Sequence, residues 1–275
     1  MPQASRKDDD FPYWLVAIAI LAAVAAALII FNDLYRQIFS ALSNGIWITV
    51  FVTLVGFALA SALGLLIAVM ALSNSIVLRQ IARFYVEVIR GIPILVLLFY
   101  IAFVGAPAFV WLWNAITSPL IEAGLIEKMT VRDFPLIWRA SIALMIGYSA
   151  FISEVFRAGI QAVDEGQLEA AKALGLNGWQ RFRFIVMPQA IRTILPPLGN
   201  DFVAMVKDSS LVSVLGVADI TQMGKVYAAG SFRFFETYTI VAFIYLLLTI
   251  SLSIALRRLE KRLDARNAAE GKSAS

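Results

Sequence analysis

The side chains that could carry out chemistry in this sequence are few and restricted in type. The chain has 275 residues and contains neither histidine nor cysteine. Histidine is the usual general base near neutral pH and the commonest metal ligand, and cysteine supplies the thiolate of many zinc sites. We therefore expect no catalytic residue, no metal and no cofactor bound by this chain. What remains is a set of hydroxyl, amide and ionisable side chains within apolar segments.

This polar set lies in two segments, about residues 136–159 and 190–209. Charged groups inside a bilayer are costly, so they tend to face a cavity or a partner. The set contains both signs of charge, which a path for a polar solute requires. Its members are Ser149, Ser153, Glu154, Asn200, Asp201, Lys207, Asp208 and Ser209.

Local ion pairing is the alternative role for the charged members of this set. Glu154 could pair with Arg157 or Arg90 near the end of its segment, and Lys207 could pair with either aspartate of the set. Such pairs would be structural, because neighbouring opposite charges lower the cost of burying each other.

Composition identifies the environment of these segments. Hydrophobic residues make up 60% of the chain and charged residues 15%, with a mean hydropathy of +0.81. A soluble domain is about 25% charged, and a bilayer-spanning helix needs about 20 apolar residues. The sequence predicts an all-α integral membrane protein with six transmembrane helices, at about residues 11–31, 46–72, 92–113, 136–159, 190–206 and 237–256.

Two of these six segments have special features. The first could be a cleaved signal peptide, but its apolar run is long and three aspartates at 8–10 replace the usual basic start. We therefore expect an uncleaved helix. In the fifth segment, Pro196, Pro197 and Gly199 predict a broken helix with exposed backbone groups.

Orientation follows from lysine and arginine, which favour cytoplasmic loops. With the amino terminus inside, most of the 23 basic residues fall in cytoplasmic segments, so both termini are predicted to be cytoplasmic. We expect three parts: residues 1–43 with a tail, an extra helix and an outer linker; a transmembrane domain over 44–256; and a cytoplasmic tail over 257–275. The outer loop at 114–135 may hold a short surface helix.

The cytoplasmic loop at about 160–188 is longer than a turn between two helices needs. Residues 167–174 are strong helix formers. Gly175 can end that helix in the left-handed conformation. A short amphipathic helix over 178–187 follows, and Pro188 is predicted to restart the chain into the fifth span. An interfacial helix pair on lipid headgroups is the alternative interpretation.

The spacing within this loop carries a resemblance. Glu169, Ala170 and Ala171 are followed at fixed intervals by Gly175, Ile185 and Pro188, with Met187 where leucine is usual. This pattern resembles the EAA loop of ATP-binding-cassette (ABC) importer permeases. The segments RGIPILVLLF, SEVFRAGIQAV, LPPLGNDF and VKDSSLVSVLGVADIT resemble the polar-amino-acid branch of that family, the histidine, glutamine and arginine type.

The resemblance implies a fold and a set of partners. The family core has five helices of the type I importer, so the first span is similar to an amino-terminal addition. The six residues of the EAA pattern would then couple the chain to ABC ATPase subunits, which hold ATP and magnesium. A second permease subunit, identical or homologous, and an extracytoplasmic amino-acid-binding protein would complete the assembly in the bacterial inner membrane. A zwitterionic amino acid needs partners of both charges, as the polar set provides.

Two other functions fit some of these features. The EAA loop alone would suit an ABC permease for another small solute. An ion-coupled secondary transporter would explain the spans and buried charges but not the helical loop. We expect membrane lipids, and no nucleic acid, among the binding partners.

Overall fold

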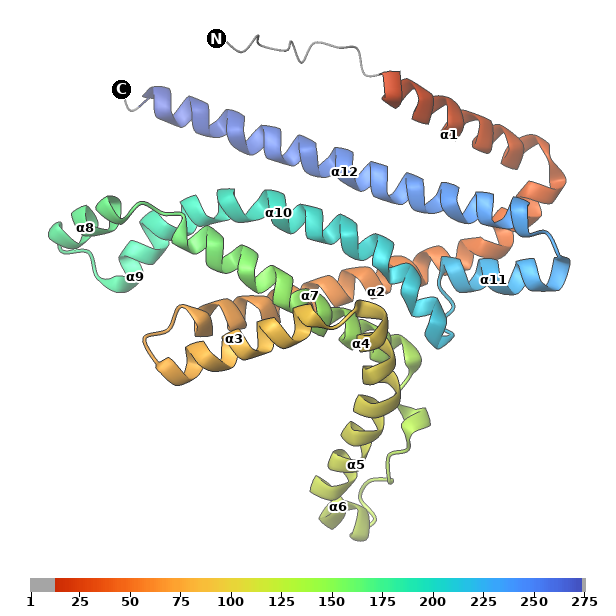
Figure 1. Cartoon of the computed structure of the whole chain (residues 1–275), viewed down its shortest axis with the longest axis horizontal. Helices are drawn as coiled ribbons and strands as arrows, with labels where there is room; N and C mark the ends of the chain where they lie inside the picture. The colour runs from red at the N-terminus through yellow and green to blue at the C-terminus, as the bar shows by residue number, and fades with distance from the viewer. Residues whose placement is uncertain (1–12, 274–275) are drawn as a thin grey trace.

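The computed structural model describes residues 13–273, which form helices and turns and no strand. The predicted all-helical fold is confirmed (Figure 1). Its α-helices are α1 Tyr13–Phe31, α2 Asp33–Ala71, α3 Ile76–Gly91, α4 Ile94–Tyr100, α5 Ala106–Ile116, α6 Ser118–Glu122, α7 Leu136–Gln161, α8 Glu165–Ala173, α9 Gly178–Arg181, α10 Met187–Asp208, α11 Ile220–Ser231 and α12 Phe234–Ser273. Two π-helical turns, Ile101–Gly105 and Phe182–Val186, and two 3₁₀ segments, Val131–Asp133 and Ser209–Leu215, complete it.

Four of the described helical segments are long and apolar enough to cross a membrane. They are Asp33–Ala71, Ile94–Ile116, Leu136–Gln161 and Phe234–Glu260. The apolar part of α1, Val16–Phe31, is shorter, and α10 is not among the four. The predicted part boundaries at 43/44 and 256/257 fall inside α2 and α12 respectively. The predicted segment 1–12 lies outside the described residues.

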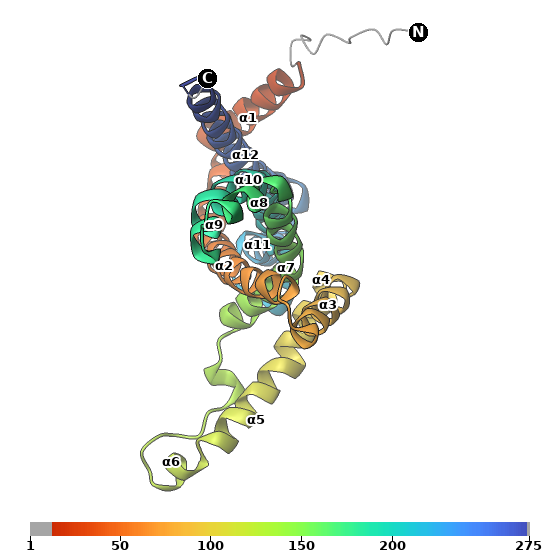
Figure 2. The ribbon, with the colours of Figure 1, turned by 90° about the vertical axis from the view of Figure 1, so that its left-hand side faces the viewer.

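The core lies where α2 packs along α7, with α10 and α4 beside them (Figure 1). Val52, Leu98, Leu144 and Met205 are all inaccessible to solvent there. Seen along the long axis, the α5–α6 hairpin extends to one side and α1 and α12 to the other (Figure 2). The lipid-sized apolar surface that remains exposed is typical of a membrane protein rather than of a soluble one.

The predicted break in the fifth span is wrong. Pro196 and Pro197 lie inside α10, which continues without interruption to Asp208. Each proline removes one backbone donor, so the carbonyl groups four residues earlier lose their helical partners. Close packing keeps the helix together: a Cβ on Gly199 would meet Leu256 of α12 at 3.1 Å.

The predicted restart at Pro188 is also wrong. α9, the π turn and α10 are consecutive, so the chain stays helical from Gly178 to Asp208. The wide turn places the Met187 amide on the Phe182 carbonyl, and Pro188 lies in the first turn of α10, where its missing donor costs little. The short helix and the fifth span therefore form one rigid element.

Two helices were not predicted. α3 follows α2 as an amphipathic helix of 16 residues, too polar for a hydropathy window to detect. α11 begins at the N-cap Asp219, whose side chain accepts a hydrogen bond from the Gln222 amide at 2.8 Å. An aspartate before an apolar periodic run is the signal that could have revealed α11.

The loop between α5 and α7 is ordered by short-range bonds. It contains α6, as predicted, and the Asn114 side chain bonds both backbone groups of Met129, at 2.8 and 2.9 Å. Hydrogen bonds from the Thr130 amide and hydroxyl hold the pKa of the Asp133 carboxyl below its usual range. The buried Arg139 of α7 donates to the Phe134 and Val131 carbonyls. This loop is thus attached firmly to the start of α7.

A first prediction concerns the contact between α2 and the start of α11. A Cβ on Gly45 would lie 2.6 Å from the Ile220 nitrogen and 2.7 Å from the Asp219 carbonyl carbon, and backbone atoms there cannot step aside. We expect Gly45→Ala to destabilise the protein by about 1–3 kcal/mol through overpacking. The matched control is Gly230→Ala in α11, where a Cβ would meet no atom within 4 Å. Thermal denaturation in detergent measures both; equal midpoints would contradict the prediction.

Candidate functional site

The first candidate site is a helical knob at the shared end of α7 and α10, residues 164–181 (Figure 1). It begins where the Asp164 side chain caps α8 by accepting from the Gln167 amide at 3.2 Å. It turns at Gly175, whose φ of +79° is left-handed as predicted. The Gly175 and Leu176 amides bond the carbonyls of Lys172 and Ala171, at 3.0 and 3.1 Å, which closes the end of α8.

The second half of the knob is capped as firmly. Asn177 and Gln180 form a reciprocal capping box, each side chain bonding the other residue's amide at 2.9 Å. The Gln189 side chain of α10 donates to Gln167 of α8 at 2.6 Å, which ties the two helices together. The knob is therefore a fixed element attached to α10, rather than a flexible linker.

The EAA residues occupy different environments within it. Glu169 and Ala170 are exposed on α8, and so are Gly175 and Pro188. Ala171, by contrast, is only 2% exposed and faces the chain's own interior. Ile185 is half-buried in the π turn. Glu169, Ala170 and Gly175 are thus free to meet another protein, whereas Ala171 lets α8 pack closely on its own neighbours.

Large apolar side chains surround this exposed carboxylate. Leu174 is 81% exposed and Trp179 is 67% exposed. The Trp179 ring stacks on Phe182, with ring centroids 5.9 Å apart. A rigid element with one acidic group among exposed apolar groups is typical of a protein-docking surface.

A second prediction tests the turn between α8 and α9. Alanine at Gly175 must adopt a left-handed conformation that costs about 1–2 kcal/mol. We expect Gly175→Ala to speed hydrogen exchange of the α8 amides by about 5–30-fold, the factor that corresponds to this cost. The control is Gly178→Ala, at the start of α9, where a Cβ meets only the tip of Arg181 at 4.0 Å. Unchanged exchange in Gly175→Ala would show that the turn does not depend on glycine.

The second candidate site comprises the polar residues of α7 and α10, and its three serines prove to be internal. Ser149, Ser153 and Ser209 are at most 1% exposed. Each hydroxyl donates to a carbonyl three residues earlier in its own helix, at 2.7–2.9 Å. Ser149 also bonds the Tyr85 hydroxyl of α3 at 2.7 Å. These serines hold helices together and leave no donor for a solute.

The acidic residues lie on the surface of open clefts. Glu154 forms an ion pair with Arg157 at 2.6 Å, the pairing predicted from the sequence. Asp208 accepts a hydrogen bond from the Tyr148 hydroxyl at 2.8 Å. Asp201 has one carboxylate oxygen that is buried and accepts no hydrogen bond from any described residue.

Asn200 and Lys207 lie on a different face of α10. Both are exposed, and at about 100° per residue they project away from the face that carries Asp201 and Asp208. No ion pair of Lys207 with either aspartate occurs among the described residues. The structure therefore divides the predicted polar set into an acidic face and a separate face with Asn200 and Lys207.

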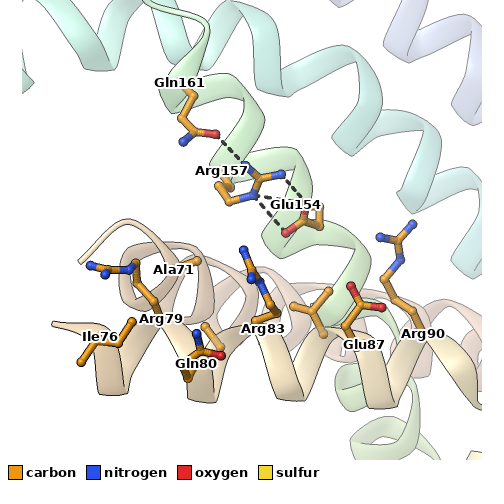
Figure 3. A pocket seen from close by; sticks show the side chains of 12 residues that line it. Ala71, Ile76, Arg79, Gln80, Arg83, Glu87, Arg90, Glu154, Arg157 and Gln161 are labelled. Atoms are coloured by element: carbon orange, nitrogen blue, oxygen red, sulfur yellow. Dashed lines mark hydrogen bonds and ion pairs between the residues drawn. The ribbon is translucent and has the colours of Figure 1, made fainter. Parts of the chain in front are cut away.

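Three clefts adjoin the acidic face. The basic cleft, of about 610 Å³, lies between α3 and the end of α7 (Figure 3). The Asp201 cleft, of about 480 Å³, lies between α7 and α10. The Asp208 cleft, of about 510 Å³, lies beside α4. Sequence reasoning missed the α3 side of these clefts because α3 itself was not predicted. Within the described part of the chain, no three acidic side chains gather as metal ligands do.

Comparison with known proteins gives concordant matches. Residues 60–265 match the model of a family described as binding-protein-dependent transport system inner membrane component. The chain is 35% identical over 222 residues to the glutamine transport system permease protein GlnP of Escherichia coli (strain K12), covering 81% of this chain and 92% of that protein. It is 36% identical over 216 residues to the probable amino-acid permease protein YxeN of Bacillus subtilis (strain 168), covering 78% and 88%.

Solved structures share the fold. A crystal structure of an amino acid ABC transporter with histidines matches with a TM-score of 0.69 and 36% identity, over 82% of this chain and 96% of that one. An inward-facing structure of the MetNI methionine ABC transporter matches with a TM-score of 0.62 at 19% identity, over 82% and 98%. At that lower identity the likeness concerns the fold alone.

Proposed function

This chain belongs to the family of binding-protein-dependent transport system inner membrane components, and on that premise we propose that it is the permease subunit of an ABC importer for polar amino acids. It is a multi-pass inner-membrane protein. The observation that carries the proposal is the rigid knob with its exposed Glu169, placed at the shared end of α7 and α10. The relatives at 35–36% identity are permeases for glutamine or amino acids, which supports the class of cargo.

The proposed topology has six spans with both termini in the cytoplasm. The segments α1, α2, α4–α5, α7, α10 and α12 cross the membrane, and the knob lies on the cytoplasmic side. The concentration of arginines near the knob end of α3 and α7 supports this orientation. Because α10 is 22 residues long, it is long enough to span the apolar layer despite its polar residues.

The proposed assembly contains two permease subunits, two ATPase subunits and an extracytoplasmic binding protein. The ATPase subunits hold ATP and magnesium and perform the hydrolysis, so this chain makes or breaks no bond. The knob seats on an ATPase through Glu169, Ala170 and the apolar side chains of Leu174 and Trp179. An exposed carboxylate of this kind suits an arginine of the partner, which can bind it with two parallel hydrogen bonds.

The geometry provides a path from the ATPase to the solute. The second half of the knob and α10 are one continuous helix, and α10 carries Asp201 and Asp208. A tilt of the knob must therefore tilt the acidic face by the same angle, because no hinge separates them. This is rigid-body switching between packed states, as in other transporters.

Reconstitution tests the proposal. The chain, co-purified with its ATPase in proteoliposomes and supplied with its binding protein, should take up a labelled polar amino acid only when ATP is present. A panel of labelled glutamine, glutamate, histidine and arginine covers the cargo class. Uptake driven by an ion gradient without ATP would instead establish the ion-coupled secondary transporter, and ATP-driven uptake of another solute alone would exclude amino acids.

A further inference from the structure

The three clefts form one groove, and Arg90 is the residue they have in common. The basic cleft and the Asp201 cleft share Arg90, Glu154 and Arg157. The Asp201 cleft and the Asp208 cleft share Arg90, Phe151 and Asp201. A polar groove therefore runs from the turn between α2 and α3, past Arg90, to Asp208 on α10.

The groove changes its charge at Arg90. The basic cleft is lined by four arginines and two glutamates, and Figure 3 shows the α3 arginines facing Glu154 and Arg157 of α7. Beyond Arg90, the ionisable residues of the Asp208 cleft are Asp201 and Asp208. A solute moving along this groove passes from acidic to basic surroundings at one residue.

The Arg90 guanidinium is free to bind an anion. It accompanies an exposed side chain and makes no hydrogen bond or ion pair with any described residue. Its carbon lies 5.2 Å from the centre of the Phe151 ring, which orients the planar group through a cation–π contact. Five N–H donors in a fixed fork match the two oxygens of a carboxylate. Glu154 does not compete for them, because Arg157 already holds it.

The partner for a positive group lies across the same cleft. Asp201 lines both clefts beyond the basic one. One oxygen of its carboxylate is buried without a hydrogen bond from the described residues. A buried unpaired acceptor is costly, and an ammonium group can satisfy it.

We propose that Arg90 binds the α-carboxylate of the transported amino acid and that Asp201 binds its α-ammonium group. This inference rests on the proposed function and adds the residues that read the two charges common to all amino acids. Asn200 and Lys207 lie off this route, on the other face of α10. The groove thus recognises the amino-acid backbone, and the cargo side chain extends toward one of the adjoining clefts.

Direct binding to the assembled permease–ATPase complex, without the binding protein, tests the inference. The probe is whichever labelled amino acid of the panel the wild-type complex takes up best, competed with its own α-amide, which lacks the carboxylate. Charge-assisted hydrogen bonds are worth about 1.5–3 kcal/mol. We therefore expect the wild type to prefer acid over amide by about 10–100-fold, the factor that this energy represents.

The variants separate the two charges. Arg90→Gln should abolish the preference for acid over amide, and Arg90→Lys should keep part of it. Asp201→Asn should weaken both ligands and leave the preference intact. The control, Arg233→Gln, removes an exposed arginine paired with Glu236 at 3.4 Å far along the chain and should change nothing.

Two results would overturn the inference. One is a wild-type complex that binds acid and amide equally. The other is an Arg90→Gln complex, shown by co-purification to be assembled, that keeps the wild-type preference. If the wild type still shows ATP-driven uptake in either case, the importer function stands and only the roles of Arg90 and Asp201 fail.

Discussion

Replacing Glu169 with lysine is expected to abolish ATP-driven uptake while leaving the isolated chain folded. Glu169 is exposed on α8, and no described residue bonds its carboxylate, so its loss costs the permease fold little. In the proposed complex, a lysine there would face the arginine that the glutamate is meant to meet. Like charges brought together at an interface cost several kcal/mol, which corresponds to a loss of docking of at least about 100-fold. Co-purification with the ATPase and labelled uptake measure the two parts of this effect.

The matched control for that substitution lies one helical turn away. Glu165 is also exposed, on the first turn of the same helix. Glu165→Lys makes the same change of charge and costs only about 0.3–1 kcal/mol through the helix dipole. We expect it to retain most uptake. If both variants fail equally, the net charge of the knob matters rather than the position of Glu169, and if both transport normally, Glu169 has no coupling role.

The sequence predicted local backbone features better than it predicted how helices meet. The left-handed turn at Gly175 depends on a conformation that glycine adopts more readily than other residues, and it is found as expected. The break at Pro196 and Pro197 was predicted from the same kind of local rule and does not occur. There, the packing of Gly199 on Leu256 and of Gly159 on Ile194 holds α10 straight. Tertiary contacts thus override a local preference that costs only a few hydrogen bonds.

The candidate site shows the same division. Both acidic residues of the α10 face were predicted, since an ionisable group within an apolar segment stands out in any sequence. Arg90 was assigned only as a loop residue or a partner of Glu154. Its position beside Asp201 joins residues 90 and 201 through the packing of α3 and α10 around α7, which no spacing rule reveals. The apolar period of α3 was the available signal, because Ala82 and Val86, four residues apart, are both buried.

The largest expected loss of stability comes from Asp219→Ala. This aspartate is fully buried, and it accepts from the Gln222 amide at 2.8 Å and from the Tyr245 hydroxyl of α12 at 3.1 Å. The neighbouring Ile220 amide bonds the Thr49 hydroxyl of α2 at 3.3 Å. Asp219 therefore joins α11 to α12 at the point where α11 also meets α2. Alanine removes the helix cap, worth about 1 kcal/mol, and leaves two buried donors unpaired at about 1–3 kcal/mol each.

The Asp219→Ala protein should therefore lose roughly 3 kcal/mol or more of stability, seen as a lower thermal midpoint of the purified chain in detergent. Asp164→Ala is the control, because Asp164 also caps a helix but is exposed, so only the cap is lost. Asp219→Asn keeps a capping oxygen and should fall between the two. Tyr245→Phe removes one of the two donors, and in that background Asp219→Ala should cost less than in the wild type. If the two substitutions are additive, the hydroxyl and the carboxylate do not stabilise each other, and α11 must be held in place by its apolar contacts with α2 and α12 alone.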